Sequence, residues 1–286
     1  MNALRSAFCL LLLLAATRPL TAQGTYTQID YPGATTTWAL GINSAGDIVG
    51  LYYDSSQNAH GFLLSGGVFT SIDYPGGPSY LVGINDLGQA VGTDFQFPFI
   101  YDISSQTFQL IQYPVAPVSP AAINNSGMVV GWLETNNAQQ FGFIYTPGPS
   151  TRLISTPDAV TTTLTTLDGQ GNLIGFSTTA GTSTSFPFSY SHGKYTKIKL
   201  DFGGNPLVNG INNAGTEIVG TYSPNNSASG FVFNVQTKAL QPLRFAHEAT
   251  IPNGVNDAGE VVGTFYDAST ATYHGFTWTP GSTPNP

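Results

Sequence analysis

Short runs of apolar residues, separated by polar turn residues, extend along the chain from about residue 25 to residue 280. In the first unit of this pattern the runs cover residues 37–43, 47–53, 60–65 and 68–74. β-Branched and aromatic residues dominate the runs, Gly and Pro together number 52, and no long 3.6-residue apolar pattern follows the N-terminal segment. These features favour strands over helices. The sequence therefore predicts an all-β protein.

One motif of about ten residues recurs six times. The first copy, GINSAGDIVG, begins at Gly41, and later copies begin at residues 83, 122, 166, 210 and 254. The closing glycines lie 42, 39, 44, 45 and 43 residues apart, a period that is typical of a four-stranded propeller blade. Asn followed three residues later by Gly predicts a type I turn with a left-handed Gly, and so a tight hairpin. A motif repeated so often indicates architecture, with the Asn residues in a structural role.

The fourth strand of the repeat is displaced. The third strand has six copies, from residues 60, 97, 141, 186, 230 and 274, whereas the fourth has only five copies after the first motif. The missing copy, TYTQIDYPG, begins at Thr25. A ring uses such a strand to close and to hide its edges. We predict a six-bladed β-propeller of four-stranded antiparallel blades in which Tyr26 to Asp30 pair beside Phe276 to Trp278. A solenoid or a pair of sandwiches is the alternative.

The Gly-Ile-Asn-x-x-Gly-x-Val-Val-Gly motif, followed by a His-Ala-Phe-like triplet, resembles the bacterial extracellular HAF repeat family. The likeness spans residues 26 to 280, with the triplet written His60-Gly61-Phe62 and His274-Gly275-Phe276 and its His absent from the other four repeats. The resemblance implies export and repetition. It implies no activity and no catalytic residues.

The first 22 residues have the three parts of a secretory signal peptide. Arg5 supplies the positive charge, residues 7–16 form an apolar stretch too short to span a bilayer, and residues 20–22 form a small-residue cleavage site. We expect a propeller over residues 23–281, a short tail over 282–286, and a secreted protein of the extracellular space or periplasm. An N-terminal membrane anchor is the alternative. The only cysteine, Cys9, lies in the signal, so no disulfide is expected.

The charge balance excludes two kinds of partner. Charged residues make up only 8% of the chain, and after the signal six basic residues face 16 acidic ones. A net charge of −10 repels nucleic acid and anionic lipid, because both are bound through Lys and Arg.

Motifs for catalysis and metal binding are sparse. The chain has no His-Glu-x-x-His, Gly-x-Ser-x-Gly or phosphate-binding Gly-rich motif. Paired acids for a glycosidase remain open among Asp54, Asp94, Glu134 and Asp267. A two-His metal site at His60 and His274 and a calcium loop at residues 168–172 are weaker alternatives to hydrogen-bonded histidines and a hairpin turn. We predict no metal and no cofactor, and we expect no enzyme, although the sequence leaves this open.

Loops that vary between repeats join the fourth strand to the next first strand, and the second strand to the third. Both sets lie on one face, which is the usual place for recognition. Aromatic residues beside acids on that face favour a neutral polar ligand such as a sugar, although packing between blades is the alternative for each aromatic residue. The predicted ligand-binding residues are Trp38, Tyr53, Asp54, Tyr80, Trp132 and Glu134. We expect a monomeric, secreted, non-catalytic protein that binds a glycan or an extracellular protein, with a polysaccharide hydrolase or lyase and a structural matrix protein as alternatives.

Overall fold

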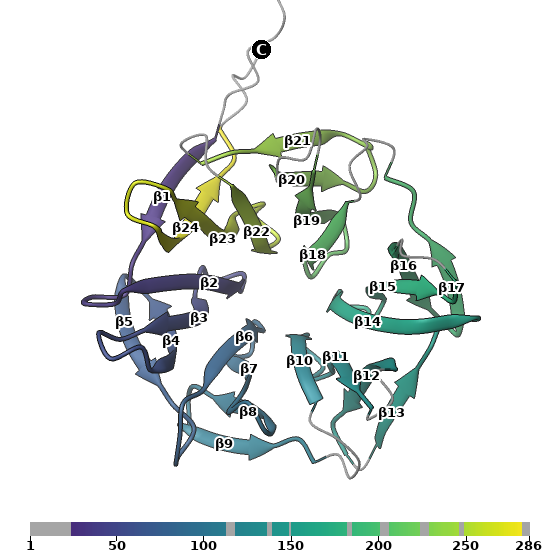
Figure 1. The fold of residues 1–286 in the computed structure, drawn as a ribbon, viewed down its shortest axis with the longest axis horizontal. Coiled ribbons are helices and arrows are strands. Elements are labelled where there is room, and N and C mark those ends of the chain that lie inside the picture. Colours follow the sequence, from purple (N-terminus) through teal and green to yellow (C-terminus); the bar gives the residue numbers. More distant parts are fainter. Residues whose placement is uncertain are drawn as a thin grey trace, which may run out of the picture.

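A computed structural model describes residues 24–112, 118–135, 139–148, 150–181, 185–200, 206–223, 229–245 and 249–281. The predicted signal peptide and the predicted tail, residues 282–286, lie outside these ranges. The described residues form β-strands arranged as a ring (Figure 1). None of them forms a helix with the length and apolar character needed to cross a membrane.

Three four-stranded antiparallel sheets follow the order of the chain. The first contains β2 (Thr36–Ile42), β3 (Ile48–Tyr53), β4 (Ala59–Ser65) and β5 (Val68–Ile72). The second contains β6 (Tyr80–Ile84), β7 (Gln89–Thr93), β8 (Pro98–Asp102) and β9 (Thr107–Leu110). The third contains β18 (Leu207–Ile211), β19 (Glu217–Tyr222), β20 (Ser229–Asn234) and β21 (Leu240–Leu243). In the first repeat the four strands agree with the predicted runs to within two residues.

A larger sheet of eight strands lies between the second and the third of these sheets. Its first half contains β10 (Val118–Ile123), β11 (Val129–Glu134), β12 (Gln140–Thr146) and β13 (Ser150–Ile154). Its second half contains β14 (Ala159–Leu167), β15 (Leu173–Thr179), β16 (Ser185–Ser191) and β17 (Lys194–Lys197). One parallel pair, Gln140 with Thr161, joins the halves. The described residues therefore form four sheets of four strands and one of eight, so the sheets alone do not give the predicted count of six blades.

The last sheet joins the two ends of the described chain. It contains β1 (Thr25–Ile29) beside β24 (Thr272–Thr279), followed by β23 (Val261–Asp267) and β22 (Thr250–Val255). The purple β1 and the yellow β24 lie side by side in Figure 1, with Tyr26 opposite Trp278 and Gln28 opposite Phe276. The predicted closure by the displaced N-terminal strand is confirmed. The protein is thus a β-propeller of four-stranded antiparallel blades, closed by its first strand.

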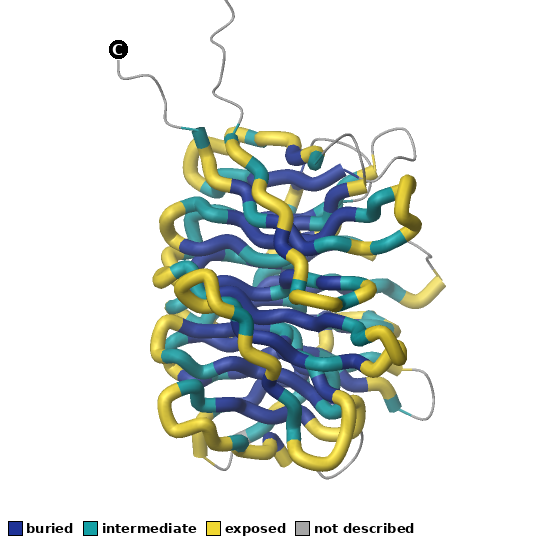
Figure 2. The backbone as a smooth tube through the Cα atoms, turned by 90° about the vertical axis from the view of Figure 1, so that its left-hand side faces the viewer, coloured by how far each residue is buried: buried dark blue, intermediate teal, exposed yellow. Residues whose placement is uncertain are grey.

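The ring has two faces, which are the rims of exposed loops on either side of the buried strand centres in Figure 2. We call the face that carries the repeated Asn-containing hairpins, such as residues 43–47, the turn face. We call the opposite face, which carries the loops of variable length, the loop face. The first strand of each repeat lies nearest the axis (Figure 1) and runs from the loop face to the turn face.

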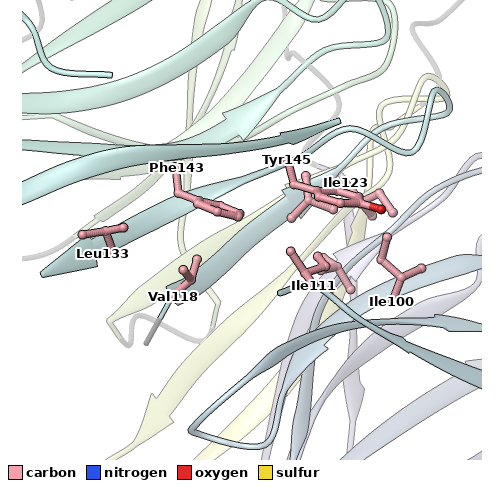
Figure 3. Packing of buried hydrophobic residues seen from close by; sticks show 9 residues of the cluster. Ile100, Ile111, Val118, Ile123, Leu133, Phe143 and Tyr145 are labelled. Carbon is pink, nitrogen blue, oxygen red and sulfur yellow. The ribbon is translucent and has the colours of Figure 1, made fainter. Parts of the chain in front are cut away.

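The core lies between neighbouring sheets. Figure 3 shows one such layer, where Ile100 and Ile111 of one sheet meet Val118, Phe143 and Tyr145 of the next. The Phe of each third strand is at most 1% exposed, and these six residues are Phe62, Phe99, Phe143, Phe188, Phe231 and Phe276. In several repeats this Phe packs directly on the glycine that closes the motif. A Cβ on any closing glycine would lie closer than 3.0 Å to a backbone carbonyl oxygen of the first strand, which explains why the motif always ends in Gly.

The motif Asn residues are buried and make two kinds of hydrogen bond. Within its hairpin, Asn43 Oδ1 accepts from the backbone N–H groups of Ala45 (3.0 Å) and Asp47 (2.9 Å), so the predicted turn role is confirmed. Its Nδ2 donates to the carbonyl oxygen of Asn85 in the next repeat, 3.4 Å away. The same link between repeats joins Asn85 to Asn124, Asn124 to Asp168 and Asn256 to Asn43. The repeated motif is therefore scaffolding that ties neighbouring repeats together around the axis.

Candidate functional site

The bulge of the first strand directs one side chain of every repeat toward the axis. In all six first strands the pairing register shifts across one extra residue, between Ala39 and Gly41 in the first repeat. A bulge leaves one residue outside the ladder and redirects its side chain. The bulge residues are Leu40, Val82, Ala121, Thr165, Asn209 and Asn253, and all six line one hollow of about 250 Å³. Because every repeat contributes one residue, this hollow lies on the axis, and we call it the axial hollow.

A second hollow of about 230 Å³ adjoins the axial hollow and shares Leu40 and Asn253 with it. It lies between the first and the last repeat, and we call it the seam hollow. Its other lining residues are Trp38, Ile251, Thr264 and Tyr273. Two hollows that share a wall reach the size of small-ligand sites, about 300–1,000 Å³.

The two hollows contain two of the predicted ligand-binding residues. Trp132 of β11 lines the axial hollow beside Thr163 and Thr165, and Trp38 of β2 lines the seam hollow beside Tyr273. The Trp38 and Tyr273 rings meet edge to face, with centroids 5.7 Å apart. Both tryptophans are partly exposed. The structure therefore brings Trp38 and Trp132 to one concave surface near the loop face.

Tyr53 and Tyr80 lie outside both hollows. The Tyr80 ring packs against Phe95 with centroids 5.0 Å apart. Burial raises the pKa of Tyr80, and the nearby Tyr53 hydroxyl raises it further. Phe95 has a φ of 70° and is 53% exposed, so this tight loop presents an aromatic ring to the solvent. Sequence reasoning missed Phe95, although the Asp-Phe-Gln-Phe turn sequence predicts a tight loop that carries aromatic residues.

The acidic residues predicted on this face are occupied within their own loops. Asp54 accepts hydrogen bonds from the backbone N–H groups of Ser56 and Asn58, both at 2.8 Å, and from Asn58 Nδ2 at 3.0 Å. The hydrogen bonds from Asn58 are the main reason why the pKa of Asp54 is lowered. Asp94 and Asp267 accept from loop N–H groups in the same way, and Glu134 accepts from Gln140 Nε2 at 3.1 Å. Among the described residues, none of these carboxylates lines the axial or the seam hollow.

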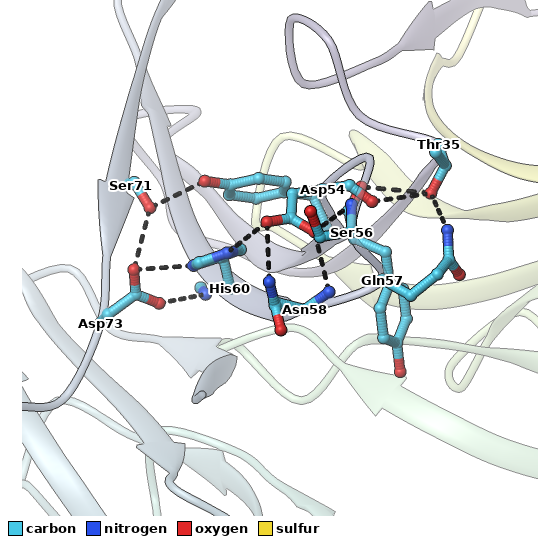
Figure 4. A network of polar contacts seen from close by, with 11 residues as sticks. Thr35, Asp54, Ser56, Gln57, Asn58, His60, Ser71 and Asp73 are labelled. Atoms are coloured by element: carbon cyan, nitrogen blue, oxygen red, sulfur yellow. Dashed lines mark hydrogen bonds and ion pairs between the residues drawn. The ribbon is translucent and has the colours of Figure 1, made fainter. Parts of the chain in front are cut away.

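His60 links two acids at the outer rim of the loop face, as Figure 4 shows. Its Nδ1 lies 2.9 Å from Asp73 Oδ2 and its Nε2 lies 3.5 Å from Asp54 Oδ2. Burial lowers the pKa of His60, but the hydrogen bonds and charges of Asp73 and Asp54 together outweigh it, so the pKa is raised. A groove of about 410 Å³ passes this cluster along residues 73–78. This pairing lies within one repeat. It holds the start of β4 beside the end of β5, the fourth strand of the same repeat.

His274 repeats this arrangement in the closing sheet. Its Nδ1 lies 2.8 Å from Asp30 Oδ1, just beyond the end of β1, and its ring stacks on Phe265. The two histidines thus bind different acids. No group of three or more His, Cys, Asp or Glu residues able to hold a metal ion occurs in the described part of the chain. Asp168, where a calcium loop was the weaker alternative to a hairpin turn, accepts hydrogen bonds from Gln170 and Asn172 of its own turn, in the position that Asn holds elsewhere.

Six polar residues of the hollows were not predicted as ligand-binding residues, namely Thr163, Thr165, Asn209, Asn253, Thr264 and Tyr273. Thr165, Asn209 and Asn253 occupy bulge positions, and Tyr273 is the second residue of β24. The signal for the two asparagines is present in the sequence, because Asn stands three residues before the motif Asn in the last two repeats only. Asn209 Nδ2 donates to Pro252 O, and Asn253 Nδ2 donates to Ala39 O, both at 2.9 Å. These bonds hold both amides in place beside the axis.

Comparison with known proteins gives the fold and no family. No family model matches this chain, and neither does the sequence of any curated protein. Among solved structures, TolB from Acinetobacter baumannii is similar, with a TM-score of 0.59 and 11% identity over 84% of this chain. The match covers 65% of the TolB chain, so about a third of that protein has no counterpart here.

The matches to two further solved structures cover a larger share of the other protein's chain. An oligogalacturonate lyase from Vibrio parahaemolyticus has a TM-score of 0.53 and 9% identity over 92% of this chain and 98% of its own. A mutant of AofleA from Arthrobotrys oligospora has a TM-score of 0.55 and 10% identity over 86% of this chain and 84% of its own. At such identities the likeness shows a β-propeller fold alone, and that fold serves binding proteins as well as some enzymes.

Proposed function

We propose that this protein is a secreted binding protein that recognises a neutral carbohydrate through the axial and seam hollows of its loop face. The observation that carries the proposal is the chemistry of the lining. Two tryptophans and a tyrosine stand beside amide and hydroxyl groups, and no charged side chain of the described residues lines either hollow. Aromatic faces stack on the apolar faces of sugar rings, and amides and hydroxyls exchange hydrogen bonds with sugar hydroxyls.

The concave shape supports a small ligand over a protein partner. The two hollows have volumes of about 250 and 230 Å³, and the bulge residues in their walls are held by backbone pairing on either side. A rigid, partly apolar hollow suits one or two sugar rings and reduces the ordering cost of binding. A flat protein surface would not enter it.

The alternative of a polysaccharide hydrolase or lyase receives no support from the arrangement of acids. Glycosidases place two carboxylates within about 10 Å of one another across the substrate. Asp54, Asp94 and Asp267 bind groups of their own loops instead, and Glu134 binds Gln140 of the adjacent strand. We therefore propose a non-catalytic protein.

Several further features belong to the same proposal. Counting the eight-stranded sheet as two blades gives a six-bladed ring, which is supported by six copies of the motif and by the single pair that joins the halves.

Export is supported by the signal-like first 22 residues, and a place in the HAF repeat family is supported by the motif. We also propose a monomer of the extracellular space or periplasm.

A glycan array with purified protein tests this function. We expect binding to neutral oligosaccharides, and we expect Trp132→Ala to weaken it at least tenfold, since aromatic stacking contributes much of the affinity. Leu87→Ala is the matched control, because Leu87 is a 66% exposed apolar residue on the turn face. Unchanged binding in Trp132→Ala would remove the axial hollow as the site. Binding only to acidic glycans or only to proteins would refute the proposed ligand class.

A further inference from the structure

Four of the six basic residues that follow the predicted signal peptide lie on two neighbouring outer strands of the ring. They are Arg152 in β13, Lys194 and Lys197 in β17, and Lys199 just after β17, and we call them the basic strip. The segments that carry them, residues 150–157 and 185–200, contain no acidic residue. The other four outer strands, β1, β5, β9 and β21, contain no charged residue. Positive charge is thus concentrated on one part of the circumference (Figure 1).

Two lysines of the strip point to the side of β17 that faces β13. Ile198 and Leu200 pack in the core toward β18 and β19. The backbone is still paired at Ile198, whose N–H donates to a carbonyl oxygen of β16 2.9 Å away. Because successive residues of a strand point to opposite faces, Lys197 and Lys199 point away from that core. Lys197 Nζ there lies 4.7 Å from the centre of the Phe186 ring.

Arg152 contributes to the strip from the neighbouring strand β13. Its guanidinium carbon lies 5.8 Å from the centre of the Tyr190 ring, and an aromatic face attracts a cation. The Tyr190 and Tyr195 rings are in contact, with centroids 4.7 Å apart. Burial and the nearby Tyr190 raise the pKa of Tyr195, and the positive charge of Arg152 opposes this rise. Arg152 therefore lies close to Tyr195, which shares a face of β17 with Lys197.

The cations of the strip have no acidic partner within the described part of the chain. All four side chains are exposed, and the ion pairs found among the described residues join histidines to aspartates. Asp158 follows the first segment and Asp201 the second, and Asp201 lies outside the described residues. Lysines often protect an exposed strand edge from pairing with another chain, but the other four outer strands have such an edge and no charge. The strip therefore points to an anionic partner outside this chain.

We propose that the basic strip binds an acidic polysaccharide, whose carboxylates pair with Arg152, Lys197 and Lys199 while a sugar ring contacts Tyr195. A guanidinium binds a carboxylate through two parallel hydrogen bonds. A polymer with one carboxylate per sugar suits a few cations beside an aromatic ring. Nucleic acid carries one charge about every 1.7 Å and is bound through many more cations.

The overall negative charge of the protein does not prevent this binding. The Debye length is about 8 Å at physiological ionic strength, so exposed acids farther away than this are largely screened from the strip. The strip lies on the circumference and shares no residue with the axial or the seam hollow. The inference therefore adds a second binding surface and does not rest on the proposed function.

Binding of acidic polysaccharides to the purified protein tests the strip. The probes are alginate, hyaluronan and polygalacturonate, measured by biolayer interferometry at about 50 mM NaCl, where exposed charges are weakly screened. We expect at least one of them to bind, and we expect about 0.5 M NaCl to abolish the binding. Methyl-esterified polygalacturonate has the same rings without the charges and should not bind. Single-stranded DNA and vesicles that contain phosphatidylglycerol serve as other anions.

Substitutions in the strip locate the binding. We expect Lys197→Gln to weaken it about 2- to 5-fold, as for one exposed ion pair, and the triple variant Arg152→Gln/Lys197→Gln/Lys199→Gln to weaken it at least tenfold. Lys238→Gln is the matched control. It removes the same charge, and Lys238 Nζ also lies over a Phe ring, that of Phe233 at 5.9 Å, but it belongs to the next repeat, on the other side of β17 from β13. Each variant should keep the unfolding midpoint of the parent, because these side chains are exposed.

The outcomes separate the strip from the hollows. Trp132→Ala should leave the binding of acidic polysaccharide unchanged, and the triple variant should leave the binding of neutral oligosaccharide unchanged. Acidic polysaccharide that binds the triple variant as tightly as the parent, or no binding of any acidic probe, would overturn the strip and leave the proposed function standing. Tighter binding of DNA or vesicles than of any polysaccharide would overturn the proposed partner. Binding by the strip without any neutral ligand would remove the proposed function alone.

Discussion

The turn face and the loop face of the ring differ in which parts of the chain their hydrogen bonds join. On the turn face the bonds run between repeats, from Asn43 to Asn85 and from Asn85 to Asn124. On the loop face the His60–Asp73 pair and the hydrogen bonds of the Asp54 turn stay within one repeat. The exception is Gln140, which pairs with Thr161 and accepts from Thr163 of the next repeat. The turn face thus links repeats through a recurring bond, whereas loops such as the one at Asp54 are held by their own groups.

This difference explains why the sequence at the turn-face end of each first strand is the same in most repeats, whereas the sequence at the loop-face end varies between repeats. A change at the constant end disturbs two repeats at once, because one Asn serves its own hairpin and its neighbour. A change at the varied end affects only a local loop or the wall of a hollow. Recognition residues can therefore be exchanged at the loop face without opening the ring, which is the general advantage of loops on a rigid scaffold.

The largest difference is expected between a methyl group added inside a blade and a methyl group added in a loop of the loop face. Gly220→Ala would place a Cβ closer than 3.0 Å to Leu207 O, whereas a Cβ on Gly77, in a loop of the loop face, has no atom within 4 Å. We expect Gly220→Ala to lower the free energy of unfolding by about 3 kcal/mol through overpacking, and Gly77→Ala to leave it within about 0.5 kcal/mol. Urea denaturation measures both, and equal losses would contradict the comparison.

A smaller difference is expected from removing one amide at each face. Asn85 Oδ1 accepts from Leu87 and Gln89, and its Nδ2 reaches Asn124 O at 3.0 Å. We expect Asn85→Ala to lower the free energy of unfolding by about 2 kcal/mol, because it leaves buried groups unpaired. Asn58→Ala, which removes an exposed amide bonded to Asp54, should cost less than about 1 kcal/mol. Similar losses in the two variants would refute a special role for links between repeats.

The pH dependence of stability should report the His60 pair. The pKa of His60 is raised above 6.5 in the folded protein, so the folded state binds the proton more tightly. Its contribution is therefore complete below about pH 6.5 and is lost as the pH rises through the folded pKa. Because the side chain is partly exposed, we expect less than about 1 kcal/mol. The stability difference between the parent and His60→Phe, measured by urea denaturation, should be larger at pH 6 than at pH 8.5; a larger difference at pH 8.5 would contradict this assignment.

The smallest effect is expected where a first strand begins at the loop face. Leu207 is 45% exposed, and the equivalent residues of other repeats include Ser119 and Thr163. Leu207→Ser should change the free energy of unfolding by less than about 0.5 kcal/mol. The next residue, Val208, is fully buried, and Val208→Ser should cost about 2 kcal/mol or more. A large loss in Leu207→Ser would show that the varied end also supports the ring.

The ring could be predicted from the sequence because its main signals are periodic. The Asn-to-Gly hairpin fixes the first two strands of each repeat, and the displaced copy at Thr25 predicts the pairing of β1 with β24. The join between the two halves of the eight-stranded sheet could not be predicted, since it depends on a single backbone pair, Gln140 with Thr161. No local pattern encodes one bridge of this kind.

The residues that line the hollows were harder to predict than the face of the ring on which the hollows lie. Side-chain direction in a strand follows simple alternation only where pairing is regular. The bulge beside Ala39 interrupts that alternation, so the direction of Leu40, and likewise of Asn253, could not be obtained from the sequence. Trp38 and Trp132 line the hollows, whereas Tyr53, the last residue of β3, and Asp54, the first residue of the loop after it, lie beyond them.

The pairing of β1 with β24 also sets an order of events during synthesis. Thr25 to Ile29 are made long before their partner strand, Thr272–Thr279. The early segment must wait without its partner until that strand has been made, and such distant pairing slows folding. A product that terminates early therefore keeps two open strand edges, and these edges would mark it for proteolysis or aggregation.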